Sequence, residues 1–99
     1  MKYLLLKDQR RRTLIANYEI RRKWLTALYN DLRLPYAFRN YIYSQLFILP
    51  RDSSITRLRN RCVLTNRPRG VYKKFGLSRL MFRKYIWQGK LVGFRKASW

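Results

Sequence analysis

A long segment near the N-terminus has the hydrophobic periodicity of a helix. From about Lys7 to Asn30 the chain contains neither glycine nor proline, the residues that most often interrupt helices. Its apolar side chains recur at helical spacing and share one face, so the pattern predicts an amphipathic helix. The members of this apolar stripe are Leu14, Tyr18, Leu25, Leu28 and Tyr29.

Two shorter helices are predicted farther along the chain. Pro35 suits the first turn of a helix over residues 35–48, which Pro50 stops. This helix is apolar nearly all round, which fits burial against a partner as well as against the first helix, or ordinary intramolecular packing. Ser78 has the side chain of an N-cap, and it predicts a third helix that ends at Gly89.

The segment from Pro50 to Gly70 has no helical periodicity and is predicted to be irregular or extended. Within it, Cys62-Val63-Leu64 is a candidate strand, and Asn66-Arg67-Pro68-Arg69-Gly70 supplies turn residues. The whole pattern predicts a small, mainly α-helical protein with irregular extended segments.

Charge is strongly positive and unevenly distributed. The 99 residues include 24 lysines and arginines but only four acidic residues, a formal charge of +20. Residues 1–50 hold ten basic and three acidic side chains, whereas residues 51–99 hold fourteen and one. A hydrophobic content of 47% argues against a wholly disordered basic tail. Because such a chain needs a polyanion to neutralise it, we expect the C-terminal half to make the primary contact.

The basic residues between positions 51 and 69 are all arginines, six in number, with Asp52 as the one acid. Guanidinium groups match phosphate oxygens two at a time and also stack on bases. The bias favours a clamp on a nucleic-acid backbone, with a solvated basic coil as the alternative. Arg21 falls within the apolar stripe of the first helix, so we expect that helix to lie between protein and RNA.

The residue types that metal sites and active sites require are nearly absent. One Cys and no His exclude a tetrahedral zinc site, which needs four ligands. The four carboxylates are far apart in sequence and the four glycines are scattered, so neither an acid–base pair nor a phosphate loop is indicated. We expect no enzyme activity, no metal and no cofactor.

Two other function classes stay open. A basic amphipathic membrane-surface protein is one, for which the helix around residues 14–29 is the only feature. A protein that compacts DNA or another nucleic acid is the other, and the lack of a recognition-helix motif disfavours it.

Five motifs follow one another in the second half of the chain: Leu49-Pro50-Arg51-Asp52-Ser53-Ser54, Arg59-Asn60-Arg61-Cys62, Thr65-Asn66-Arg67-Pro68-Arg69-Gly70, Lys74-Phe75-Gly76-Leu77-Ser78-Arg79 and Lys96-Ala97-Ser98-Trp99. In this order and spacing they resemble the ribosomal small-subunit protein fourteen family. Residues 1–48 are similar to its long bacterial and organellar form in length, basic character and helix pattern.

The resemblance implies a structural role without catalysis. Members of the family bind rRNA in the head of the small subunit, near the decoding region, beside small-subunit proteins three, ten and nineteen. One branch holds zinc through two C-x2-C pairs, whose positions correspond here to Cys62, Thr65, Ser78 and Met81. With one ligand present, this chain resembles the zinc-free branch, which implies a compact zinc-ribbon-like knuckle without the metal.

The knuckle is then expected to be held by apolar packing, with Val63, Val71, Tyr72, Phe75, Leu77 and Met81 as the candidates. Asn66 stands where the family more often has Gly, and Asn tolerates the left-handed backbone that the turn needs.

The resemblance divides the chain into a basic helical N-terminal extension, residues 1–49, and an rRNA-binding knuckle module, residues 50–99. Trp99 and Tyr72 are candidates for stacking on RNA. The expected phosphate contacts are Arg51, Arg57, Arg59, Arg61, Arg67, Arg69, Lys73, Lys74, Arg79, Arg83 and Lys96.

The N-terminal half is rich in Tyr, Ile, Leu and Phe, a drift that suggests a gene carried by an organelle. No targeting segment is visible, because the run Leu4-Leu5-Leu6 is too short for a signal peptide. We favour the mitochondrial small subunit, in the matrix, with a bacterial cytoplasm or a plastid as the alternatives.

Overall fold

The computed structural model describes residues 2–99, so Met1 of the expected N-terminal extension lies outside it. The described residues form two compact units, residues 2–58 and residues 59–99. The first unit is a helical hairpin followed by two short 3-10 helices, and the second is a β-hairpin followed by a helix and a tail. The predicted fold class, mainly helical with irregular segments, is confirmed.

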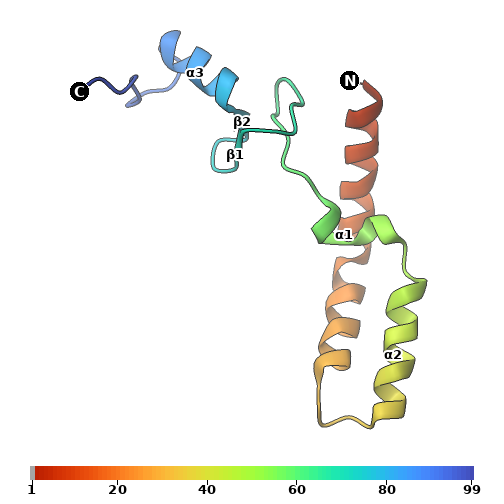
Figure 1. The fold of residues 1–99 in the computed structure, drawn as a ribbon. Helices are drawn as coiled ribbons and strands as arrows, with labels where there is room; N and C mark the ends of the chain where they lie inside the picture. Colours follow the sequence, from red (N-terminus) through yellow and green to blue (C-terminus); the bar gives the residue numbers. More distant parts are fainter. Residues whose placement is uncertain (1) are drawn as a thin grey trace. The chain divides into compact units, whose positions relative to one another are not determined.

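Two helices build the hairpin unit (Figure 1). The first, α1, spans Lys2–Asn30, and the second, α2, spans Tyr36–Ile48. α2 lies beside the C-terminal half of α1 and buries Ile42, which is 5% exposed, while Leu49 just beyond it is 7% exposed. Both predicted helices are confirmed, although α1 begins five residues earlier than its periodicity indicates. All five residues of the predicted apolar stripe are half-buried.

The turn between α1 and α2 is fixed by polar contacts at both of its ends. The Asp31 carboxylate accepts from the Arg33 amide at 3.0 Å. Arg39 Nε donates to the Tyr29 carbonyl at 2.9 Å, and the same guanidinium lies over the Tyr29 ring, 5.6 Å from its centroid. The Tyr29 and Tyr43 rings pack 5.6 Å apart. Arg39 therefore satisfies an otherwise unpaired carbonyl at the end of α1 and ties the two helices together.

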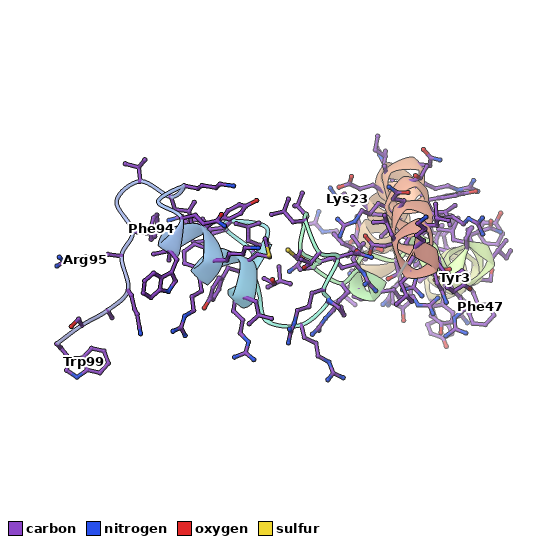
Figure 2. The ribbon with its side chains drawn as sticks, turned by 90° about the horizontal axis from the view of Figure 1, so that it is seen from above. Tyr3, Lys23, Phe47, Phe94, Arg95 and Trp99 are labelled. Carbon is purple, nitrogen blue, oxygen red and sulfur yellow. The ribbon has the colours of Figure 1, made fainter. Side chains whose placement is uncertain are left out.

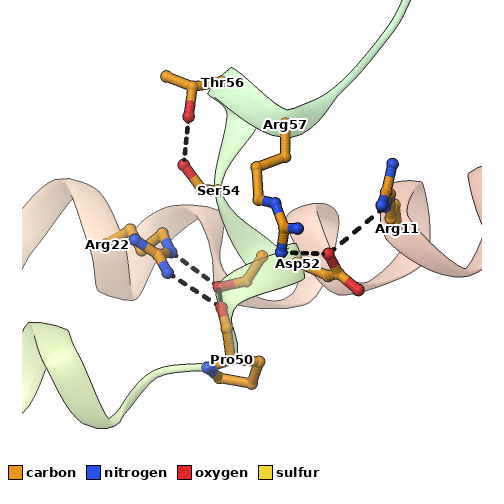
Figure 3. A network of polar contacts seen from close by, with 8 residues as sticks. Arg11, Arg22, Pro50, Asp52, Ser54, Thr56 and Arg57 are labelled. Carbon is orange, nitrogen blue, oxygen red and sulfur yellow. Dashed lines mark hydrogen bonds and ion pairs between the residues drawn. The ribbon is translucent and has the colours of Figure 1, made fainter.

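The helical spacing places Arg21 within the apolar stripe of α1, but the structure does not bury it there. Arg21 is exposed, and the half-buried guanidinium belongs to the next residue, Arg22. Arg22 Nε donates to Ser53 Oγ at 2.7 Å, and its Nη2 donates to the Pro50 carbonyl at 3.0 Å (Figure 3). Adjacent residues are rotated by about 100° around a helix, so a shift of one position exchanges the protein-facing side for the exposed side.

The segment after α2 forms two single-turn 3-10 helices, η1 (Arg51–Ser53) and η2 (Ile55–Arg57), where irregular or extended backbone was expected. Asp52 Oδ1 accepts from Arg57 Nη1 at 2.6 Å and lies 3.4 Å from Arg11 Nε. Figure 3 shows this carboxylate between the two guanidinium groups. Together with Arg22, these contacts hold the segment against α1.

The first regular element of the C-terminal unit is a minimal β-hairpin. Its strands are β1 (Val71–Tyr72) and β2 (Leu77–Ser78), which pair antiparallel with Val71 opposite Ser78. Gly76, in the connecting turn, has a φ of +65°, a left-handed conformation that glycine adopts without steric cost. The hairpin brings the start of the following helix back toward residues 62–70, where Arg79 N donates to the Gly70 carbonyl at 2.7 Å.

The third helix, α3, spans Arg79–Trp87 and confirms the prediction from its caps. Ser78 is the N-cap, and its Oγ accepts from the Met81 amide at 3.4 Å. Gln88 is the C-cap, and Gly89 follows with a left-handed φ of +67°. This arrangement is the usual way to end a helix, because glycine takes the left-handed position without strain.

The predicted strand at Cys62-Val63-Leu64 is wrong, because residues 63–65 form a turn. The Cys62 carbonyl accepts from Asn66 N at 2.9 Å, and the Cys62 amide donates to the Arg67 carbonyl at 3.0 Å. The carbonyl and the amide of Cys62 are thus hydrogen-bonded to residues four and five positions later, so the backbone forms a turn. The turn also leaves Val63 80% exposed, so its expected place in the knuckle packing is wrong as well.

Aromatic rings form the centre of the C-terminal unit. Phe82 lies within 5.6 Å, between ring centroids, of Tyr72, Phe75 and Phe94. Phe75 and Phe94 also pack edge to face at 5.4 Å, a favoured geometry for aromatic pairs. Figure 2 shows Phe94 beside α3, while Trp99 lies at the far end of the tail. Of the other expected packing residues, Val71, Leu77 and Met81 are half-buried.

Candidate nucleic-acid interface

The four positions that correspond to zinc ligands in one branch of the resembled family are joined by hydrogen bonds. Cys62 Sγ accepts from the side chain and backbone amide of Thr65 and from the backbone amide of Ser78. Ser78 Oγ in turn accepts from the amide of Met81. Within residues 2–99, no group of three or more His, Cys, Asp or Glu side chains could hold a metal ion. The centre of the knuckle is therefore a hydrogen-bonded cluster around one sulfur.

The hydrogen bonds to Cys62 also change its acidity. Cys62 is 2% exposed, and burial raises the pKa of its thiol. The hydrogen bonds from Thr65, Ser78 and Leu64 stabilise the thiolate and lower the pKa from 9.0 to about 6. The hydrogen bonds around this buried sulfur therefore favour the ionised form of the thiol.

Asn66 has a φ of +59°, the left-handed backbone expected from its place in the turn. Its carbonyl accepts from Arg61 Nη1 at 3.2 Å. Two neighbouring arginines make similar contacts, Arg59 Nε to the Pro68 carbonyl at 2.9 Å and Arg67 Nε to the Arg69 carbonyl at 3.2 Å. These bonds fix the loop that carries the arginines and set the direction of their side chains.

Most of the other predicted RNA contacts in this unit lie on its surface. Lys74 Nζ lies 5.8 Å from the centroid of the Phe75 ring, which is within the range of a cation–π contact. Tyr72 packs its ring on Phe82 and is about half exposed, whereas Trp99 is fully exposed. The remaining exposed cations of the predicted set are Arg69, Lys73, Arg79, Arg83 and Lys96.

A groove of about 530 Å³ lies along α3 and the tail. Tyr72, Leu80, Phe82, Ile86, Trp87 and Phe94 form its apolar surface. Its cationic lining consists of Arg79, Arg83, Arg95 and Lys96. The structure thus brings three of the predicted phosphate contacts to one aromatic-lined surface, together with Arg95, which was not predicted.

Arg51 and Arg57 belong to the helical hairpin unit rather than to the C-terminal unit. Arg57 is bound to Asp52, whereas Arg51 is exposed in η1. The predicted arginine set therefore divides between the two units.

Carboxylates are absent from the C-terminal unit. Residues 59–99 contain twelve lysines and arginines and neither Asp nor Glu. The positive potential at this surface is consequently not offset by side-chain carboxylates of the same unit, which favours binding of a polyanion.

Several residues that shape the molecule were not found by sequence reasoning. No signal in the sequence indicated that Arg11 and Arg22 contact other residues of the chain, because an arginine that faces protein cannot be distinguished by sequence from one that faces solvent. Phe82 and Phe94 were overlooked although both are aromatic, and Arg95 precedes the predicted Lys96. Helical spacing could have found Phe82, which lies four residues after Ser78 on the packed side of α3.

None of the described helices is both long and apolar enough to cross a membrane.

Comparison with known proteins gives a consistent result. Residues 45–98 match the family described as ribosomal protein S14p/S29e. The small ribosomal subunit protein uS14m of Marchantia polymorpha is 44% identical over 95 residues, which cover 96% of both chains. The uS14m of Vicia faba is 46% identical and covers 95% of this chain and 94% of its own. The uS14 of Chlorobium chlorochromatii is 56% identical over 89 residues, 90% of this chain and 98% of its own.

Proposed function

We propose that this chain, which belongs to the uS14 family and is therefore a structural, non-enzymatic protein of the small ribosomal subunit, binds and orders rRNA in the subunit head near the decoding region. Residues 50–99 act as the rRNA-binding module, and residues 1–49 extend it. The observation that carries this proposal is the uncompensated charge of the C-terminal unit, twelve cations without a carboxylate.

The predicted contacts fit the chemistry of a folded RNA backbone. Arginines at the turn are oriented by bonds to main-chain carbonyls, and such pre-orientation reduces the entropy lost when a phosphate binds. Phosphate contacts position a protein on a nucleic acid without reading its sequence. The role we propose is accordingly one of ordering rRNA rather than recognising a short sequence.

Binding of the full chain to an rRNA fragment from the subunit head, measured across a salt series, tests this proposal. The slope of log affinity against log salt should contain about −0.7 to −0.9 for each phosphate neutralised. The variant Arg79→Gln/Arg83→Gln/Lys96→Gln should flatten the slope by ~2–3 on the same rule.

The matched control is Arg10→Gln/Arg21→Gln/Arg33→Gln, which removes the same charge from exposed positions of the hairpin unit. It should change the slope less than the C-terminal triple does. An affinity that does not depend on salt, or two triples with equal effects, would contradict the proposed binding surface.

We further propose that neighbouring head proteins, small-subunit proteins three, ten and nineteen, pack against this chain. The exposed apolar side chains of α2, Tyr36, Phe47 and Ile48 among them, support a protein neighbour on the hairpin unit. Cross-linking of isolated small subunits, followed by identification of peptides joined to residues 36–48, would test the assignment. Cross-links to rRNA alone would contradict it.

The compartment we propose is the mitochondrial matrix, because two close relatives are mitochondrial uS14m proteins and the N-terminal half has the composition of an organelle-encoded gene. A bacterial cytoplasm is the alternative that the Chlorobium relative supports. Co-sedimentation with small subunits from purified mitochondria is the expected result. Co-sedimentation with another small subunit alone would reject this location.

A further inference from the structure

We propose that the groove along α3 and the tail holds one unstacked nucleotide of the rRNA, with the base against Trp87 and the phosphates on Arg79, Arg83 and Lys96. This inference rests on the proposed function and adds to it a ligand class and a site. Binding of rRNA phosphates by the cations of the C-terminal unit requires no contact with a base, whereas the proposed nucleotide site requires one.

The shape of the groove fits a group the size of a nucleotide. Its volume of about 530 Å³ lies within the range of ~300–1,000 Å³ that pockets for small organic ligands occupy. Its aromatic wall is already assembled, because Phe82 and Phe94 pack at 5.6 Å and Tyr72 and Phe82 at 5.2 Å. A ligand would therefore meet a surface that does not have to form first.

The side chains that face solvent here combine stacking and charge. Arg79, Arg83 and Trp87 follow one another at intervals of four residues, so they share one face of α3. Trp87 is 70% exposed at the last turn of the helix, and Lys96 lines the groove from the tail. An exposed indole beside three cations offers the base a flat ring and the backbone a set of counterions.

Charge complementarity favours a nucleotide over an apolar protein segment as the occupant. An apolar side chain would cover Trp87 and Leu80 but would bring nothing to neutralise the four cations of the lining. A nucleotide brings a π-face and a negative charge together. Bases in a duplex are already stacked, so the occupant has to come from a loop, a bulge or a single strand.

The test compares two probes of equal length and charge, a short oligouridine and an abasic ribose–phosphate oligomer. The full-length wild-type chain should bind the oligouridine about 5- to 150-fold more tightly, the range expected from stacking of one base. Trp87→Ala should bind both probes alike, at the affinity of the abasic one. Trp24→Ala is the matched control, since Trp24 is 67% exposed, lies in the other unit and does not line the groove.

The possible failures can be told apart. Salt-dependent binding of rRNA without a preference for the base-bearing probe would overturn the nucleotide site and leave the proposed function standing. Equal effects of Trp87→Ala and Trp24→Ala would overturn it too. Absence of any binding to rRNA or to either probe would contradict the proposed function itself.

A second pair of variants guards against loss of folding. If Trp87→Ala loses its helical circular dichroism, Trp87→Phe and Trp87→Leu keep apolar bulk with and without an aromatic face. Trp87→Phe should retain part of the preference and Trp87→Leu should lose it. A Trp87→Leu chain that keeps the preference but no longer enters small subunits would identify a protein side chain as the occupant and reject the nucleotide.

Discussion

The hairpin unit, residues 2–58, and the C-terminal unit, residues 59–99, each contain twelve lysines and arginines, yet their charges have different surroundings. All four carboxylates lie in the hairpin unit. There, Arg11 pairs with Asp52, and Arg22 and Arg39 donate to main-chain carbonyls that close the fold. In the C-terminal unit no side-chain carboxylate offsets the cations.

This difference shows that a count of basic residues does not locate the surface for a polyanion. The two units have equal numbers of cations and both use some of them on main-chain carbonyls, but only the hairpin unit pairs its cations with side-chain carboxylates. The C-terminal unit has no side-chain carboxylate to offer and depends on a ligand for neutralisation. Which cations remain for RNA is therefore decided by what the fold already binds.

The largest expected difference concerns folding of the free chain. Ordering a residue costs about 1–2 kcal/mol of backbone entropy, and the buried apolar residues here are few. We predict that residues 2–33 and 50–61 exchange their amide hydrogens rapidly in the free chain and become protected when rRNA is bound. Protection should rise about tenfold for each 1.4 kcal/mol that binding adds.

Hydrogen exchange on the free protein and on isolated small subunits measures both states. Strong protection of residues 2–33 in the free chain would contradict coupled folding. The same experiment also tests whether a partner covers α2 of the hairpin unit, because the amides of residues 35–48 should then be protected from exchange in the subunit. Rapid exchange there in the assembled state would contradict a partner on α2.

The second prediction removes the aromatic centre of the C-terminal unit. Phe82→Ala deletes the ring that contacts Tyr72, Phe75 and Phe94, and it should lower the free energy of unfolding by about 3 kcal/mol, the lower end for loss of a packed Phe. Urea unfolding followed by far-UV circular dichroism, in sulfate buffer to strengthen burial, measures the change. Phe47→Ala, at an exposed position of α2, is the control and should cost well under half as much.

The third prediction tests the arginine that holds the hairpin unit. Arg22→Ala removes two donors and leaves the buried Ser53 hydroxyl and the Pro50 carbonyl without them, so it should destabilise this unit by about 2 kcal/mol. Arg21→Ala removes the same charge from an exposed neighbour and should change stability by less than ~0.5 kcal/mol. Urea titration of the rRNA-bound chains, in which residues 2–33 and 50–61 are expected to be ordered, distinguishes them, and equal losses would refute the assigned role of Arg22.

The elements that the sequence predicted well are those with capping or helix-breaking residues at their ends. Pro35 and Pro50 bracket α2, and Ser78 and Gly89 bracket α3, so local chemistry fixed these boundaries. The motifs of residues 49–99 likewise led to the uS14 family, which the comparisons confirm. The left-handed φ of Asn66 followed from its place in a turn.

The elements that were missed depend on contacts between distant parts of the chain. The apolar positions of α1 placed Arg21 within the stripe and gave no signal for Arg22, because only the position of η1 decides which of the two faces protein. Strands of two residues, such as β1 and β2, are too short to show alternation. Phe94 joins the aromatic centre through a tail whose path no local pattern specifies.

The smallest expected effect concerns Cys62, the buried thiol of the C-terminal unit. Because the pKa of the folded thiol, about 6, lies below its ordinary 9.0, the thiolate contributes stability that is fully present above pH 9 and is lost as pH falls toward 6. Cys62→Ser cannot ionise in this range. At pH 6 the variant should therefore differ from wild type by about 1 kcal/mol or less, since serine keeps the size and a hydrogen-bonding atom.

As the pH rises from 6 to 9, the stability of wild type relative to Cys62→Ser should increase, because only the wild-type thiol ionises in this range. Urea midpoints of both proteins at several pH values in that window measure it. Cys62→Ala loses both the ionisation and the hydrogen bonds, whereas Cys62→Ser loses only the ionisation. A comparison of the two variants therefore separates the two contributions. A wild-type advantage that shrinks with rising pH would show that the folded thiol is not the stronger acid. A constant advantage would show that ionisation of the thiol has no part in holding the knuckle.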